Sequence, residues 1–270
     1  MIIEETVERI KQIYNNKEIS FPKVSRVVIG LGYTGVEIFT HENKTILGVA
    51  STLTKTINAT DCNKINFAGN LTNHPLVELM SWSYGPPSIN KIIGIAALNA
   101  ASQHFFKTAT TYKEVKGDIL DYLNIKKSTT VTIIGLMKPF IRDLRKRTKD
   151  ITIIEDTIEI SAEFKEFHFK NTIEKLKPEE LNVDVLFTTG TALINNSIES
   201  ILNLFLKKAG KIVMIGPSVS MLPDILFENG VDVVGGMEII DSESALRVIQ
   251  EGGGTKLFKQ YGKKYNLIKA

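Results

Sequence analysis

The segment VDVLFTTGTALIN at residues 183–195 decides the fold, together with a helical pattern and the segment KIVMIGPS at residues 211–218. Each quoted segment contains a short apolar run that leads into glycine and hydroxyl-bearing residues. Two apolar strands joined by a helix form a βαβ unit, whose crossover makes the strands parallel. Ligands of open α/β sheets bind outside the carboxyl ends of the strands. The sequence therefore predicts a binding site where these two strands end.

Strand and helix patterns alternate through most of the second half of the chain. The strand patterns lie at residues 130–135, 151–154 and 231–234, and the helical patterns at residues 139–149, 221–228 and 241–251. This alternation predicts a parallel, doubly wound sheet. The tail from Gly252 onward carries lysines and two tyrosines, and we expect it to form a surface segment.

The first half has a different organisation. An amphipathic helix at residues 2–15 precedes three strands at residues 24–30, 35–39 and 45–50, and helices follow at residues 75–80 and 88–102. The short turns between the strands favour an antiparallel meander. The last helix is rich in alanine and glycine, which permits close packing. We therefore predict an α+β domain at residues 1–110 and an α/β domain at residues 111–270.

Composition narrows the class of protein. The 270 residues are 43% hydrophobic and 23% charged, as expected for a soluble globular protein with a core. The net charge of +3 gives no reason to expect a nucleic-acid partner. The single cysteine, Cys62, excludes an internal disulfide framework and fits a reducing cytoplasm. Because neither a signal peptide nor a long apolar run is found, we expect a cytoplasmic chain without a membrane partner.

The loops after the two strands of the opening segment hold the candidate ligand-binding residues. These are Thr189, Gly190, Thr191, Asn195, Gly216, Pro217 and Ser218. Asn196 and Glu199 have the spacing of a capping box, which leaves Asn195 without a structural task. A glycine between two threonines lets the backbone turn sharply and present N–H groups and hydroxyls to a ligand. The alternative is a tight turn with local threonine hydrogen bonds.

The first βα turn of the second half differs from a dinucleotide-binding turn. Gly135 is present, but Met137 and Lys138 occupy the space that the other glycines of G-x-G-x-x-G would leave open for a pyrophosphate. Glu155 lies twenty positions after Gly135, where ribose-binding carboxylates occur. Two interpretations of Lys138 stay open. It holds an anion at a helix N-terminus, or it is a solvated lysine on an exposed helix face.

Residues that bind soft metals are scarce. The four histidines, His41, His74, His104 and His168, are dispersed and show no zinc-site spacing. The sequence leaves open that the acidic residues at the strand ends bind a hard cation. The sequence also lacks a P-loop and a G-x-S-x-G nucleophile elbow, so no nucleophile–base pair can be named. The sequence therefore does not decide between a catalyst and a binding protein.

Taken together, these motifs resemble the putative heavy-metal-chelation family, a domain of unknown function in bacteria and archaea, and its usual partner domain. The residues that carry the resemblance are Gly135, Lys138–Phe140, Glu155, Thr189–Asn195, Gly216–Ser218, Pro223, Gly230–Asp232 and Gly235–Gly236 in the second half, and Gly30, Gly48–Ala50 and Ile95–Ala100 in the first. The resemblance implies an enolase N-terminal-like domain followed by a Rossmann-like domain. It also implies a ligand site in the cleft between them.

Our leading hypothesis is a small polar or anionic ligand in that cleft, with Asn99 contributed by the first domain. The resemblance implies that the ligand is a metal ion or a metal chelate. One alternative is an enzyme that uses a nucleotide-like cofactor such as S-adenosylmethionine, with Glu155 on the ribose. Another is a ligand sensor without turnover. The sequence also leaves open that the chain assembles into a homo-oligomer.

Overall fold

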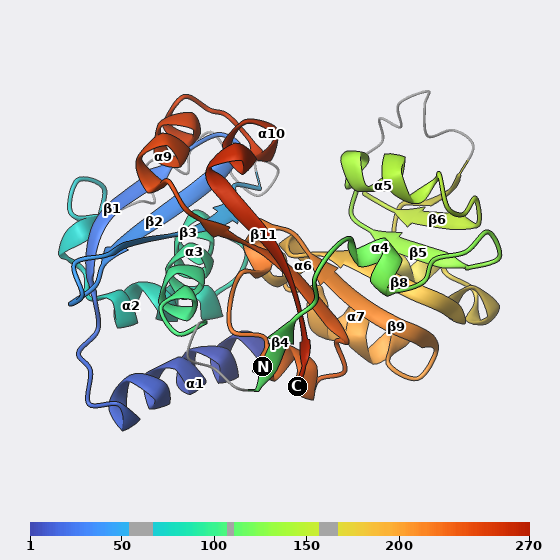
Figure 1. Ribbon diagram of the computed structural model, residues 1–270, viewed down its shortest axis with the longest axis horizontal. Helices are drawn as coiled ribbons and strands as arrows, with labels where there is room; N and C mark the ends of the chain where they lie inside the picture. Colours follow the sequence, from blue (N-terminus) through green and yellow to red (C-terminus); the bar gives the residue numbers. More distant parts are fainter. Residues whose placement is uncertain (54–66, 107–110, 157–166) are drawn as a thin grey trace.

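The computed structural model describes residues 1–53, 67–106, 111–156 and 167–270, and shows an α/β protein with two sheets (Figure 1). Cys62 and residue 110, the predicted domain boundary, lie outside the described residues. The division at that boundary stays a prediction. None of the helices in the described part of the chain is both long and apolar enough to cross a membrane.

The helices and strands follow the predicted order closely. The helices are α1 (Ile2–Asn16), α2 (Leu76–Ser81), α3 (Ile89–Gln103), α4 (Ile119–Tyr122), α5 (Lys138–Leu144), α6 (Thr191–Ile194), α7 (Ile198–Phe205), α8 (Asp224–Glu228), α9 (Ser242–Gln250) and α10 (Thr255–Phe258). The strands are β1 (Lys23–Ile29), β2 (Tyr33–Phe39), β3 (Thr45–Ser51), β4 (Tyr112–Glu114), β5 (Val131–Ile134), β6 (Ile151–Ile154), β7 (His168–Lys170), β8 (Val183–Thr189), β9 (Ala209–Ile215), β10 (Val233–Ile239) and β11 (Gly262–Lys269).

The predicted meander of the first half is confirmed, and helices cover both of its faces. Strands β1, β2 and β3 pair antiparallel in chain order. Helix α3 packs so closely on β3 that a Cβ atom at Gly48 would lie 2.1 Å from the carbonyl oxygen of Ala96. On the other face, Leu47 and Val49 share a core cluster with Leu246 and Ile249 of α9. The carboxyl-terminal part of the chain therefore returns to cover the first sheet (Figure 1).

The second sheet has eight strands in the order β4-β11-β10-β9-β8-β5-β6-β7. The strands from β10 to β7 are parallel to one another, which confirms the doubly wound prediction for this part. The predicted surface tail is wrong, because β11 pairs antiparallel with both β10 and β4. Tyr265 and Leu267 of β11 are buried, whereas Lys263 and Lys264 are exposed. The strand therefore buries apolar side chains although three of its eight residues are lysines.

Helices lie on both faces of the eight-stranded sheet. Apolar residues of α4 and α5 form one core cluster with Val185 and Phe187 of β8. Leu186, which points to the opposite face of the same strand, belongs to a second cluster with α6, α7 and α8. That second cluster also contains the apolar residues of α1 and α3. One continuous core therefore connects the two halves on this side of the sheet.

Two predicted helices are shorter in the structure. Helix α5 ends at Leu144, and the N–H groups of Lys146 and Arg147 then donate to carbonyls three residues earlier, as in a 3₁₀ turn. Helix α8 begins at Asp224 and not at residue 221, with Pro223 as its N-cap. A proline disfavours helical backbone in the residue before it, which explains the late start.

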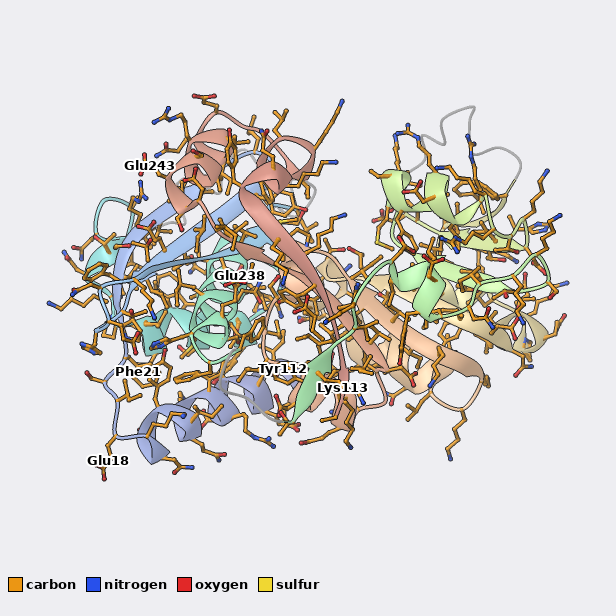
Figure 2. All side chains as sticks on the ribbon, in the orientation of Figure 1. Glu18, Phe21, Tyr112, Lys113, Glu238 and Glu243 are labelled. Atoms are coloured by element: carbon orange, nitrogen blue, oxygen red, sulfur yellow. The ribbon has the colours of Figure 1, made fainter. Side chains whose placement is uncertain are left out.

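A cluster of charged residues joins the first sheet to α9. The Arg26 guanidinium donates to both carboxylate oxygens of Glu37, at 2.9 and 2.8 Å, and to Glu243 of α9. Figure 2 labels Glu243 at this edge of the molecule. Burial alone would raise the pKa of Glu37, but hydrogen bonds from Arg26 and Ser25 lower it below its usual value. The ionised carboxylate therefore stabilises the folded chain.

Replacing Glu37 by glutamine should lower the free energy of unfolding by about 1–2 kcal/mol at pH 7, since Arg26 keeps only part of its hydrogen bonding. Because the pKa of Glu37 is lowered, this stabilisation is complete above the usual value near 4.5 and disappears as the pH falls through the lowered pKa. Denaturant titrations at pH 7 and pH 3 measure the difference. The exposed pair of Arg9 and Glu228 provides a control, since Glu228→Gln should change stability by less than about 0.5 kcal/mol.

Candidate functional site

A cavity of about 570 Å³ opens at the carboxyl ends of β5, β6 and β8. Strands β5 and β8 are neighbours, and the chain order runs outward from them in opposite directions. This is the topological switch point of the sheet, where open α/β proteins bind ligands. The volume is in the range of about 300–1,000 Å³ that is usual for small-molecule sites. The described lining residues are Thr52, Leu53, Ile134–Met137, Ile154–Asp156, Asn171–Glu174, Thr189, Thr191, Ala192, Asn195, Ser197 and Ile201.

Glu155 lies in the cavity wall directly after β6. One of its carboxylate oxygens accepts a hydrogen bond of 2.7 Å from the backbone N–H of Leu136. This bond joins the end of β6 to the loop after β5 and fixes the position of the carboxylate. The structure therefore places Glu155 beside the Gly135 loop, as its spacing in the sequence predicts.

The loop after β5 uses its own N–H groups internally. The N–H of Leu136 donates to Glu155, and the N–H of Met137 donates to the carbonyl oxygen of Gly135 at 3.0 Å. Gly135 has a φ of +96°, and a Cβ atom there would lie 2.5 Å from the Thr189 side chain. Gly135 is therefore required for the turn and for its packing against β8, and the N–H groups after it are already hydrogen bonded.

Thr189 and Thr191 both line the cavity, with Gly190 between them. The Thr189 hydroxyl accepts a hydrogen bond of 3.4 Å from the N–H of Thr191, which is the local bonding that the alternative interpretation predicts. Gly190 packs against the loop after β9, since a Cβ atom there would lie 2.8 Å from the backbone nitrogen of Val219. The two glycine loops are therefore adjacent, as predicted, but only the first contributes to the described lining.

The predicted capping box at Asn196 is wrong, and Asn195 has the structural task. The Asn195 side chain accepts hydrogen bonds from the N–H and the hydroxyl of Ser197, at 3.1 and 2.7 Å. Asn196 has a φ of +62° and accepts a hydrogen bond from the ammonium group of Lys91. Asn195 still lines the cavity, so it both bonds the turn between α6 and α7 and faces the site.

Lys91 is a contributor that the sequence did not reveal. It lies in α3 and is only 1% exposed, and its ammonium group also donates to the carbonyl oxygen of Gly85 at 3.1 Å. Burial lowers the pKa of Lys91. This lysine of the first half thus holds the turn that carries Asn195. Lys91 is the one charged residue of α3, and its place in the first turn gave no signal for this contact.

Three other predicted site residues form the junction between the two halves. The Asn99 side chain is fully buried and donates to the carbonyl oxygens of Val49, Pro217 and Ser218, at 2.9, 3.4 and 3.2 Å. The Ser218 hydroxyl accepts a hydrogen bond of 2.9 Å from the N–H of Ser51. Asn99, Pro217 and Ser218 are therefore brought together, but outside the described lining of the cavity. Gly216, which turns the chain after β9 with a φ of +128°, also lies outside it.

The charged residues of the described lining are all acidic. They are Glu155, Asp156 and Glu174, and no lysine, arginine or histidine is found among the described residues of the wall. Lys138 is exposed at the start of α5 and lies outside this lining. Within the described residues no group of three or more histidine, cysteine or acidic side chains could hold a metal ion.

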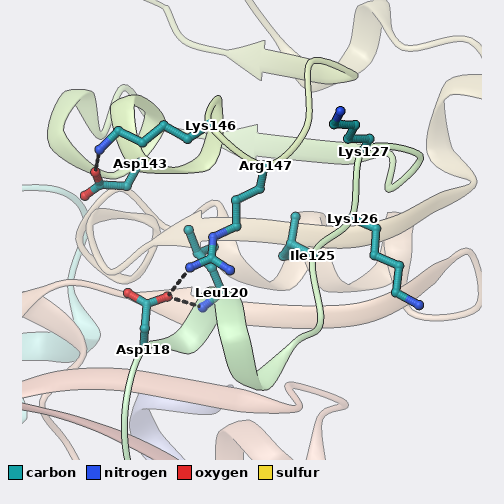
Figure 3. A pocket seen from close by; sticks show the side chains of 8 residues that line it. All are labelled: Asp118, Leu120, Ile125, Lys126, Lys127, Asp143, Lys146 and Arg147. Atoms are coloured by element: carbon teal, nitrogen blue, oxygen red, sulfur yellow. Dashed lines mark hydrogen bonds and ion pairs between the residues drawn. The ribbon is translucent and has the colours of Figure 1, made fainter.

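A second hollow, of about 710 Å³, lies beside α4 and α5 near the amino ends of β5 and β6 (Figure 3). Two of its cations, Lys146 and Arg147, are paired with neighbouring carboxylates. Arg147 interacts with Asp118 and Asp121, and Lys146 lies 2.7 Å from Asp143. Because α/β sheets bind ligands at the carboxyl ends of their strands, the cavity around Glu155 is the candidate site.

Comparisons with known proteins connect this arrangement to uncharacterised relatives. Two family models match the chain, one over residues 118–268 and the other over residues 16–102, and both are described as putative heavy-metal chelation. An uncharacterised protein of Methanocaldococcus jannaschii is 29% identical over 273 residues, which cover 99% of this chain and 98% of that protein. The relatives therefore extend over both halves.

Two solved structures of proteins of unknown function share the fold. One, from Pyrococcus horikoshii, has a TM-score of 0.75 at 24% identity and covers 100% of both chains. The other, from Desulfitobacterium hafniense, has a TM-score of 0.69 at 18% identity and covers 97% of this chain and 99% of its own. These similarities show that both halves and their arrangement are a shared fold.

Proposed function

The chain belongs to the family described as putative heavy-metal chelation, and on that premise we propose that it binds a small polar organic ligand in the cavity around Glu155. One observation carries the proposal: a cavity at the switch point of the sheet, walled by the loops after β5, β6 and β8. Apolar walls with a few polar groups are typical of small-molecule sites. Hydroxyls, amides and the fixed Glu155 carboxylate provide those groups here.

The hydrogen-bonding groups of the wall select the ligand class. Lys138, which suggested an anionic ligand, is exposed and lies outside the described lining, and the carboxylate, hydroxyl and amide oxygens of the wall are acceptors. This set favours a neutral or cationic ligand over an anionic one. The acceptor groups of the wall favour ligands that carry hydroxyl or amino donors.

Direct chelation of a heavy metal by these side chains does not fit the described donor set. Soft metals prefer thiolate and imidazole ligands, whereas the described wall offers carboxylates, hydroxyls and amides. The Glu155 carboxylate already accepts the N–H of Leu136. We therefore expect the organic ligand, and not the protein, to supply most of the donors to any metal that is bound.

A thermal-unfolding screen at pH 7 tests this function. Neutral, cationic and anionic polar compounds are compared, and Ni²⁺ is offered alone, as its neutral histidine complex and as its anionic EDTA complex. We expect stabilisation by neutral or cationic compounds, reaching about 2.7 kcal/mol at one hundred times the dissociation constant. The nickel–histidine complex should stabilise more than free Ni²⁺ or nickel–EDTA.

The variant Glu155→Gln should lose this stabilisation while it keeps the fold, because glutamine can still accept the N–H of Leu136. Glu179→Gln is the matched control, since Glu179 is exposed and lies outside the cavity. Stabilisation by anionic compounds alone, or stabilisation that is equal in the wild type and Glu155→Gln, would contradict the proposed function.

A further inference from the structure

We propose that the ligand of the Glu155 cavity is a ribonucleoside that carries no phosphate group. This inference rests on the proposed function and names its ligand class. It depends on three features of the described chain: the strand order around the cavity, the hydrogen bonds of the loop after β5, and the composition of the wall.

The strand order gives Glu155 its chemical role. From β7 to β10 the order of the sheet is the third, second, first, fourth, fifth and sixth strand of a doubly wound unit that begins at β5. In that order the first βα loop and the carboxylate after the second strand flank the ligand, and the carboxylate accepts hydrogen bonds from sugar hydroxyls. Glu155 follows β6, which is the second strand, and lines the cavity. An ionised carboxylate is an acceptor only, so a pair of ribose hydroxyls is a matching donor group.

The loop after β5 uses two of its backbone N–H groups internally, which disfavours a phosphate. Dinucleotide sites offer free backbone N–H groups of this loop to a pyrophosphate. Here the N–H of Leu136 donates to Glu155 and the N–H of Met137 donates to the carbonyl oxygen of Gly135. The Met137 side chain also lines the cavity, where a dinucleotide fingerprint would have glycine. A phosphate would find these two donors occupied and the carboxylate of Glu155 close by.

The rest of the wall suits a flat base. Apolar side chains come from several elements around the cavity, and Asn171, Thr172 and Asn195 add amide and hydroxyl groups that can bind a base edge. The apolar residues are Leu53, Ile134, Ile154, Ile173 and Ile201. With Glu155 on the ribose, this composition accommodates a base on one side and an uncharged or cationic 5′ substituent on the other.

Isothermal titration of the full chain tests the inference. The probes are adenosine, guanosine, cytidine and uridine, the 5′-monophosphate and the 2′-deoxy form of each, and the sulfonium nucleoside S-adenosylmethionine. We expect at least one unphosphorylated ribonucleoside to bind, and its 5′-monophosphate and 2′-deoxy forms to bind about tenfold more weakly or worse. Glu155→Gln should weaken the binding of the parent nucleoside by about tenfold. It should also reduce the difference in affinity between the ribo and 2′-deoxy forms. Glu179→Gln should bind like the wild type.

Three results would overturn the inference. In the first, no ribonucleoside binds, and in the second, a 5′-monophosphate binds as tightly as its nucleoside. In the third, neither removal of the 2′-hydroxyl nor Glu155→Gln weakens binding. Thermal unfolding of each variant checks that the fold is intact. If nucleosides fail while other neutral or cationic compounds stabilise the wild type through Glu155, only the nucleoside inference is lost. If neither class stabilises the chain, the proposed function fails as well.

Discussion

Replacing Gly48 by alanine should destabilise the protein by about 3 kcal/mol or more, because no side chain fits between β3 and α3. A Cβ atom at Gly48 would lie 2.1 Å from the carbonyl oxygen of Ala96 and 2.3 Å from the backbone nitrogen of Ala100. Both contacts are with the backbone of α3, so a change of side-chain rotamer cannot relieve them. The whole helix would have to move away from the sheet, and the packing of its buried residues would loosen.

Chemical denaturation with circular dichroism measures this loss. Gly254→Ala is the matched control, because a Cβ atom at Gly254 would have no neighbour within 4 Å. This control should change the free energy of unfolding by less than about 0.5 kcal/mol. Equal stability of the two variants would mean that α3 does not approach β3 as closely as the structure shows.

Local patterns in the sequence predicted most of the fold. Alternating apolar residues with short polar turns predicted the meander, and apolar runs that end in glycine predicted β8 and β9 with a helix between them. The small residues of α3 predicted close packing, which Gly48 now explains. These features depend on neighbours a few residues apart, so their signals are present in any short window of sequence.

Strand β11 shows where local patterns fail. It pairs with β10 and β4, and β4 lies about half the chain away in sequence. Only the alternation of Tyr265 and Leu267 indicated a buried face, and the neighbouring lysines obscured it. Pairing with distant strands, and not composition, makes this segment part of the sheet.

The candidate site was predictable at the level of loops and not of side chains. The carboxyl ends of adjacent parallel strands must meet, so Glu155, Thr189 and Thr191 lie in one cavity. Whether a side chain faces a ligand depends on what the rest of the fold packs against it. Asn195 caps a turn and still faces the cavity, whereas Lys138 lies outside its described lining.

Asn99 is the residue whose predicted and observed surroundings differ most, and Asn99→Asp should be among the most damaging single changes. The aspartate would keep the shape of asparagine but place a carboxylate against the carbonyl oxygens of Val49, Pro217 and Ser218. The side chain is fully buried, so water cannot compensate. A loss of about 4 kcal/mol or more is expected at pH 7.

The stability of three variants separates a structural role of Asn99 from a ligand-binding role. Asn99→Leu removes the donors without adding charge and should cost less than Asn99→Asp, about 2–3 kcal/mol. The exposed Asn203 of α7 provides the control, since Asn203→Asp should change stability by less than about 0.5 kcal/mol. Burial raises the pKa of an introduced carboxyl group, so the deficit of Asn99→Asp relative to wild type should shrink as the pH falls. If both Asn99 variants unfold like the wild type and only ligand binding is lost, Asn99 acts on the ligand and the junction does not depend on its hydrogen bonds.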